Sequence, residues 1–231
     1  MNFQTRAPAG ANSSVFDALE TRRAIKVFDP AHQLHDDQVR ALLTASALSP
    51  TAFNIQNRHV VVVRNRALKQ RLSDAAFGQR QVAEASAVFV LTADLEAHRR
   101  TDRYLRNAPT PARESLEQMI AGQFEGNEVA LHEEGVRATA MMAMSLMLAA
   151  TDMGLDSGPM TGFDRSKVQE LLGLDDSHPP LLLVVVGRGT RAAHPRLGLL
   201  DFEEFVSFDR FGKVGLRGPL DVDQNTVQPA S

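Results

Sequence analysis

Hydrophobic positions along this chain form short continuous runs and longer runs with helical spacing, and the two kinds alternate. The continuous runs cover residues 60–63, 87–93 and 181–186. Their continuous apolar character predicts strands that are buried on both faces of a covered sheet. Apolar residues at helical spacing predict helices over residues 15–19, 36–49, 67–76, 112–121, 134–153 and 164–172.

Polar and helix-breaking residues mark the ends of several of these helices. We expect Ser13 or Ser14 to cap the first helix and Asp36 to cap the second, because short polar side chains accept hydrogen bonds from free backbone amides. Pro50 ends the second helix, and Gly154 ends the helix over residues 134–153.

The helix over residues 134–153 is nearly apolar on all sides after Thr139. A helix of that kind lies at the centre of a core or between two subunits. Helices that alternate with few strands, together with this one very apolar helix, predict a single α+β domain that needs a partner.

The remaining segments differ in character from this core. Residues 95–132 are polar and irregular, which predicts an excursion or lid. Residues 1–13 are expected to form a flexible leader, and residues 212–231 a C-terminal arm or tail. No repeat and no Pro/Gly-rich linker divides the chain, so we expect one domain over residues 14–211.

Composition excludes several classes of function. A hydrophobic content of 43% over 231 residues can form a substantial core, and a net charge of −3 gives no general attraction to nucleic acid or anionic membranes. The absence of cysteine excludes disulfides, thiolate catalysis and cysteine-ligated metal centres. No apolar run reaches membrane-spanning length and no signal peptide is recognisable, so we expect a cytoplasmic protein without a membrane partner.

Missing motifs argue against three further classes. Apart from His32 and His35 in a loop, no two histidines have metal-ligand spacing, so we expect no metal site. Neither a Gly-x-Gly-x-x-Gly segment nor a phosphate-binding Lys-Ser/Thr loop occurs, which argues against a Rossmann domain or a nucleotide triphosphatase. The absence of tryptophan and the single tyrosine, Tyr104, leave little for stacking on nucleic-acid bases.

The first predicted helix ends in a cluster of cations. Arg22, Arg23 and Lys26 place two or three positive charges within one turn. Guanidinium groups in that arrangement can bind a phosphate. Cations at an ordinary solvated helix end only interact favourably with the negative end of the helix dipole. The segment alone favours the second interpretation and leaves the first open.

This basic segment and a second one resemble motifs of the nitroreductase-like flavoproteins. Residues 22–28 are similar to that family's Arg-Arg-Ser-x-Arg/Lys-x-Phe segment, with Ala24 in place of serine. Residues 50–56 are similar to its Pro-Ser-x-x-Asn-x-Gln loop, with Thr51 preserving the hydroxyl group.

Two later segments extend the resemblance, which covers roughly residues 15–206. Residues 154–164 resemble the family's Gly-Leu-x-x-x-Pro-x-x-Gly-Phe-Asp run. Arg196 falls where relatives carry a Lys-x-Arg pair, and His194 takes the place of the lysine. Four motifs in the family's order are a stronger signal than any one of them.

The resemblance implies flavin mononucleotide (FMN) as the cofactor and assigns roles to these segments. Arg22 and Arg196 are expected at the phosphate, and Lys26 beside the pyrimidine edge of the ring, where a positive charge stabilises the reduced flavin. A backbone amide of Thr161 or Gly162 is expected near flavin N5. The full set of expected FMN-binding residues is Arg22, Arg23, Ala24, Lys26, Pro50, Thr51, Ala52, Asn54, Gln56, Gln79, Gln81, Pro159, Met160, Thr161, Gly162, His194 and Arg196.

The resemblance also implies a fold and an assembly. In relatives, a central, mostly antiparallel sheet is flanked by helices, and the loop corresponding to residues 50–56 reaches the flavin of the opposite subunit. An intertwined homodimer with two composite sites is therefore expected. Phe124 and the excursion around it are expected to cover the ring and contact the substrate, with core packing as the alternative for Phe124.

The activity implied by the resemblance is that of an NAD(P)H oxidoreductase. NADH or NADPH would reduce the flavin and leave, and a small electron-poor acceptor such as a nitroaromatic or a quinone would then take the electrons in a ping-pong reaction. The flavin carries the chemistry, so no side chain is expected as a catalytic acid or base. Two alternatives are a specialised relative that fragments flavin or dehydrogenates its own substrate, and a flavin-binding protein without turnover.

Overall fold

The structure, a computed structural model, describes residues 15–220 and residue 222. The expected leader, the expected cap at Ser13 or Ser14 and half of the expected tail lie outside these described residues. The boundaries of the single domain, residues 14 and 211, remain predictions.

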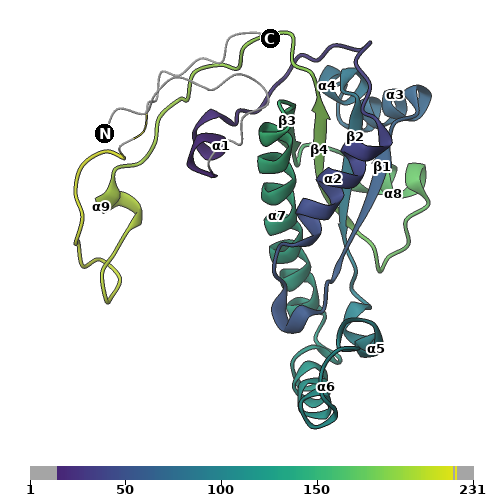
Figure 1. The fold of residues 1–231 in the computed structure, drawn as a ribbon, viewed down its shortest axis with the longest axis vertical. Coiled ribbons are helices and arrows are strands. Elements are labelled where there is room, and N and C mark those ends of the chain that lie inside the picture. The colour runs from purple at the N-terminus through teal and green to yellow at the C-terminus, as the bar shows by residue number, and fades with distance from the viewer. Residues whose placement is uncertain (1–14, 221, 223–231) are drawn as a thin grey trace.

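A four-stranded sheet forms the centre of the molecule (Figure 1). Its strands are β1 (Arg58–Val63), β2 (Ala87–Ala93), β3 (Asp156–Met160) and β4 (Pro180–Gly187), in the order β1-β2-β4-β3. All three neighbouring pairs are antiparallel. Every residue of β2 is buried, as the continuous apolar run predicts.

The edge strand β3 is not among the three strands that the sequence predicts. Gly158 and Pro159 are poor strand formers, so the local sequence gives no strand signal. The pairing of Ser157 with Val186 and of Met160 with Leu183 supplies the strand instead. An edge position tolerates the proline, because one side of the strand needs no ladder hydrogen bond.

Helices cover both faces of the sheet, because alternate residues of β2 and β4 point in opposite directions. Val88 and Val185 pack with α3 (Arg66–Ala75), α4 (Arg80–Glu84) and α8 (Arg165–Leu172). On the other face, Phe89 and Val184 pack with α2 (Asp36–Ala47) and α7 (Glu128–Asp152). The expected α+β arrangement of a covered sheet is confirmed.

The caps follow the expectations in part. Asp164 caps α8 by accepting the Lys167 amide at 3.1 Å. The expected cap of α2 at Asp36 is wrong: the helix begins one residue earlier than a cap at Asp36 implies, with His35 as its N-cap. Asp36 lies in the first turn, where its carboxylate pairs with Arg64 at 2.6 Å instead of binding a free amide.

The long helix α7 runs along the whole sheet (Figure 1) and begins six residues earlier than the apolar pattern indicates. The side chain of Asn127 caps it by accepting the Ala130 amide at 3.1 Å. At Gly135 the helix lies so close to β2 that an added Cβ would come 2.6 Å from the Cβ of Ala93. Some apolar residues of α7 remain exposed, with Val136 44% and Met141 37% accessible.

The excursion over residues 95–132 has a small core of its own beyond one end of the sheet (Figure 1). It contains a 3₁₀ turn at Ala97–Arg99, α5 (Thr101–Tyr104) and α6 (Thr110–Phe124). The buried residues of this core include Ile55 from the loop before β1, so the excursion and that loop pack together.

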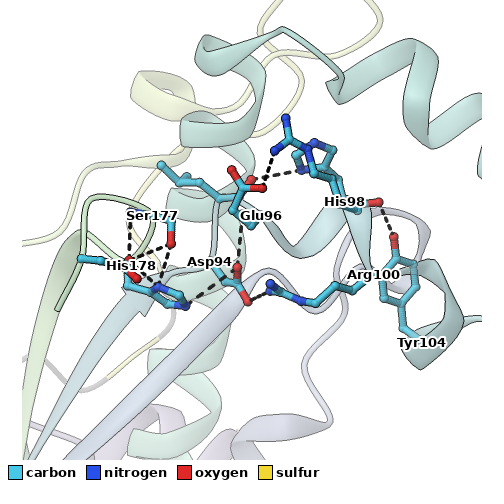
Figure 2. A network of polar contacts seen from close by, with 10 residues as sticks. Asp94, Glu96, His98, Arg100, Tyr104, Ser177 and His178 are labelled. Atoms are coloured by element: carbon cyan, nitrogen blue, oxygen red, sulfur yellow. Dashed lines mark hydrogen bonds and ion pairs between the residues drawn. The ribbon is translucent and has the colours of Figure 1, made fainter.

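A polar network ties the start of the excursion to the turn before β4 (Figure 2). Asp94 forms an ion pair with Arg100, and His178 Nε2 lies 3.9 Å from the same carboxylate. On its other side, His178 Nδ1 is 2.8 Å from Asp175. Hydrogen bonds from His178 and Ser177 lower the pKa of Asp175 to about 2.

The two ends of the described chain extend away from the sheet (Figure 1). Beyond Thr190 the chain has little regular structure except α9 (Phe202–Phe205), and α1 (Val15–Thr21) lies on the same side of the molecule. Both segments expose large apolar side chains, among them Phe16, Leu197, Phe205 and Phe211. None of the helices in the described ranges is long and apolar enough to cross a membrane.

Candidate functional site

The basic segment after α1 lies between β3 and the stretch that follows β4. Ile25 donates its amide to the Ser157 carbonyl at 3.0 Å, and the Thr190 amide donates to the Val27 carbonyl at 3.1 Å. An added Cβ at Gly158 would come 2.9 Å from the Ile25 carbonyl oxygen, so this close approach depends on glycine. The fold therefore brings three of the four similar motifs to one end of the sheet.

The side chain of Arg196 contacts the end of α1 and lies near Arg22. Its Nη2 donates to the carbonyls of Leu19 at 3.3 Å and Glu20 at 3.1 Å. Burial and, second, the positive charge of Arg196 lower the pKa of Arg22. Within the described ranges neither arginine forms a salt bridge, so the pair creates a local positive field that an anion would relieve.

The remaining cations of this cluster have different surroundings. Arg23 is only 7% exposed and donates to the carbonyls of Glu20 at 2.6 Å and Arg22 at 3.2 Å, which stabilises the end of α1. Lys26 and His194 are exposed. Lys26 therefore fits the interpretation as a cation at a solvated helix end, whereas the half-buried Arg22 does not.

Residues 159–162 form the end of β3 and the turn after it, and two glutamines hold them in place. Gln79 Nε2 donates to the Gly162 carbonyl at 2.9 Å. Gln81, which is buried, donates to Gln79 Oε1 at 2.9 Å and lies 3.6 Å from the sulfur of Met160. Thr161 and Gly162 remain exposed. Gln79 and Gln81 therefore lie beside residues 159–162, which belong to the same expected set of FMN-binding residues.

The loop over residues 50–57 lies elsewhere, beside the excursion. Asn54 Nδ2 donates to the Tyr104 carbonyl at 3.0 Å, and Thr51 Oγ1 accepts the Gln56 amide at 3.0 Å. The loop contacts Glu134 near the start of α7, whereas the basic segment lies beside the strand that follows the end of α7. The helix from Glu134 to Asp152 advances by eighteen residue steps, which span about 27 Å at about 1.5 Å per step. One chain does not bring these two motifs together.

Phe124 is fully buried inside the excursion. Its ring lies edge-on to Phe53, with 6.4 Å between ring centroids, and packs near His98. A side chain without exposed surface contacts no substrate in this arrangement, so the structure places Phe124 in core packing, the alternative considered above.

An open hollow of about 760 Å³ lies beside α3 and α4 and is distinct from this site. Arg66, Gln70, Arg80 and Glu84 line it, and none of the residues similar to the flavoprotein motifs does. Arg80 and Glu84 neutralise each other in an ion pair at 2.5 Å. Among the described residues, no group of three His, Asp or Glu side chains is arranged to hold a metal ion.

Comparison with known proteins agrees with the fold and the motifs. The model of the nitroreductase family matches residues 19–188. Protein DrgA of Synechocystis is 37% identical over 179 residues, which are 77% of this chain and 85% of that protein. An NADH dehydrogenase of Thermus thermophilus is 34% identical over 183 residues, which are 75% of this chain and 86% of that protein.

A solved structure shares the fold. The crystal structure of an Exiguobacterium sibiricum protein in complex with FMN covers 81% of this chain and 94% of its own, with a TM-score of 0.74 and 24% identity. The fold and the matched motifs define an α+β oxidoreductase. The chain belongs to the nitroreductase family, which confirms the resemblance inferred from residues 22–28, 50–56 and 154–164.

Proposed function

We propose that this chain is an FMN-dependent NAD(P)H oxidoreductase that reduces electron-poor small molecules, such as nitroaromatics and quinones, in a ping-pong reaction. When bound, FMN supplies hydride acceptance and donation at its N5 atom. The observation that carries the proposal is the close approach of Arg22 and Arg196, because a dianionic phosphate satisfies both.

The donors at this position fit a phosphate group. Arg22 Nε is buried and makes no hydrogen bond, although a buried N–H without a partner is costly. Arg196 is anchored by α1, which leaves its charge fixed beside Arg22. Together they would hold the phosphate of FMN, with His194 on the same segment as Arg196.

Residues 159–162 would lie against the flavin ring. Gln79 and Gln81 hold this segment in place, which supports a fixed backbone N–H of Thr161 or Gly162 toward N5. Lys26 is exposed on the segment beside β3 and would place its charge near the pyrimidine edge, where negative charge develops on reduction. Solvent would supply the protons, so no side chain needs to act as an acid or base.

The separation of the two half-sites supports a homodimer. The loop with Thr51, Asn54 and Gln56 lies toward one end of α7 and the basic segment at the other, so in our proposal a second copy brings the loop to the cofactor. The uncovered apolar residues on α1, α7 and the segment after β4 are the surface that such a dimer would bury.

Mixing FMN-loaded protein anaerobically with NADH or NADPH tests the proposed function. We expect the absorption band of oxidised flavin to bleach and to return when a quinone is added. Bleaching only by another substrate would identify a specialised relative, and no bleaching by any donor would identify a flavin-binding protein without turnover. A preparation that retains no flavin and accepts none on reconstitution would contradict the cofactor assignment.

A further inference from the structure

The loop over residues 51–57 has a conformation that its own sequence does not favour. Phe53, Asn54 and Gln56 have φ angles of 50°, 59° and 48°. Side chains of L-residues rarely adopt positive φ, and several such residues in succession persist only where surrounding contacts impose them. The contacts that impose this conformation therefore determine which atoms the loop presents.

One of these contacts comes from a buried carboxylate on α7. Glu134 is 7% exposed, and its Oε1 accepts the Ala52 amide at 3.2 Å. Its Oε2 lies 3.3 Å from Arg137, which also binds the exposed Glu133 at 2.7 Å. A carboxylate is costly to bury unless it is paired and hydrogen-bonded, and the Ala52 amide and Arg137 supply these partners to Glu134.

The position of Glu134 is itself fixed. The next residue, Gly135, packs directly on Ala93 at the end of β2, where no larger residue fits without movement. Asp94 follows Ala93 and donates its amide to the Asn57 carbonyl at 3.0 Å. The loop is thus tied near its start to α7 and at its end to the residue after β2, next to the close contact between Gly135 and Ala93.

We propose that Glu134 is a positioning residue: through the Ala52 amide it holds the loop in the conformation that contacts FMN. This inference rests on the proposed function, because the loop is the part expected to reach the cofactor of the second subunit. Glu134 itself touches neither cofactor nor substrate. Its contribution is to keep Thr51, Asn54 and Gln56 in place before the cofactor binds.

Three substitutions at Glu134 distinguish the effect of side-chain reach, the distance the side chain extends toward the loop, from the effect of its charge. Glu134→Ala removes the acceptor, Glu134→Asp keeps the charge but withdraws the carboxylate by one methylene, and Glu134→Gln keeps an oxygen at the same reach without the charge. Glu133→Ala is the matched control, because it removes a neighbouring carboxylate that shares Arg137 but makes no contact with the loop.

Two measurements are made on each variant of the full chain. Hydrogen exchange of the Ala52 amide, measured by NMR without cofactor, reports the loop contact directly. Quenching of FMN fluorescence on titration into apoprotein gives the Kd. We expect the Ala and Asp variants to exchange faster at Ala52 and to bind FMN up to about tenfold more weakly, the effect of losing one hydrogen bond to the loop. The Gln variant and the Glu133→Ala control should resemble the wild type in both.

The outcomes distinguish this inference from the proposed function. Unchanged FMN affinity in the Ala and Asp variants, or equal weakening by Glu133→Ala, would overturn the inference while the function stands. Weakening by Gln but not by Asp would also overturn it, since charge rather than reach would then matter. If the wild type binds no FMN, the proposed function fails, and the exchange data alone decide whether Glu134 holds the loop. Should Glu134→Ala not fold, the Asp and Gln pair makes the same comparison.

Discussion

Burial and, second, the charge of Arg196 lower the pKa of Arg22, although α1 and the segment after β4 lie at opposite ends of the sequence. Two like charges held together make binding of an anion more favourable, because the anion removes their repulsion as well as filling the free Arg22 donor.

Replacement of Arg22 by alanine should therefore weaken FMN binding. Loss of one hydrogen bond to a charged group costs about 1.5–3 kcal/mol, which is roughly a ten- to hundredfold rise in Kd. Fluorescence titration of apoprotein measures it. Arg40→Ala, which removes an exposed arginine from α2, serves as the control. Equal Kd values for wild type and Arg22→Ala would show that the phosphate lies elsewhere.

Composite sites predict complementation between two defective chains. Arg22→Ala and Asn54→Ala subunits, unfolded together and refolded, should form mixed dimers in which one site receives both intact halves. Bound FMN in the mixture should exceed that of either variant alone, and light scattering should give the mass of a dimer. No recovery in a mixture that demonstrably contains mixed dimers would mean that both motifs serve a site within one chain.

Gly135→Ala tests the close contact between α7 and β2. The added Cβ would overlap Ala93, and overpacking of this kind costs about 1–3 kcal/mol. We expect a lower Tm in thermal unfolding followed by circular dichroism. Gly122→Ala on α6 is the matched control, because nothing lies within 4 Å of the added methyl group. In that helix, alanine should stabilise slightly, by about 0.5–1 kcal/mol. A Gly135→Ala protein as stable as wild type would contradict the tight packing.

Asp175 predicts a dependence of stability on acid. Its pKa in the folded chain is about 2, below that of the unfolded chain, so its contribution is present above about pH 4 and is lost as the pH falls toward 2. The Tm of Asp175→Asn should therefore lie below that of wild type at pH 5, and the gap should close on acidification. Asp176→Asn, one residue along, should show no such pattern. A gap that stays constant from pH 5 to pH 3 would argue against the assigned contacts.

The sequence predicts local elements well where one residue pattern decides them. The run at residues 87–93 gives β2 with its observed bounds, because continuous burial needs no information from elsewhere. The strand β3 could not be found in this way, since Gly158 and Pro159 resist strand formation and only pairing with β4 overrides them. The apolar pattern places the start of α7 six residues too late, because residues 128–133 mix three apolar with three polar side chains and adjoin an irregular stretch.

The site depends more on long-range contacts than the fold does. No periodicity brings Arg196 to Arg22; the family resemblance suggested the pair, and the fold places them together. The sequence identifies Glu134 only as the first residue of a predicted helix. A carboxylate at the edge of a very apolar stretch is a signal of a special role, but that role becomes clear only from the position of Ala52 in the structure.

The uninterrupted length of α7 has a consequence for the proposed homodimer. Because one rigid helix would separate the loop of one site from the basic segment of the other, its number of turns would set the spacing between the two sites. Deleting four residues from its middle would shorten that spacing by about 6 Å and rotate one half-site against the other by roughly 40°. Variation in such a protein is therefore expected in side chains along α7 rather than in its length.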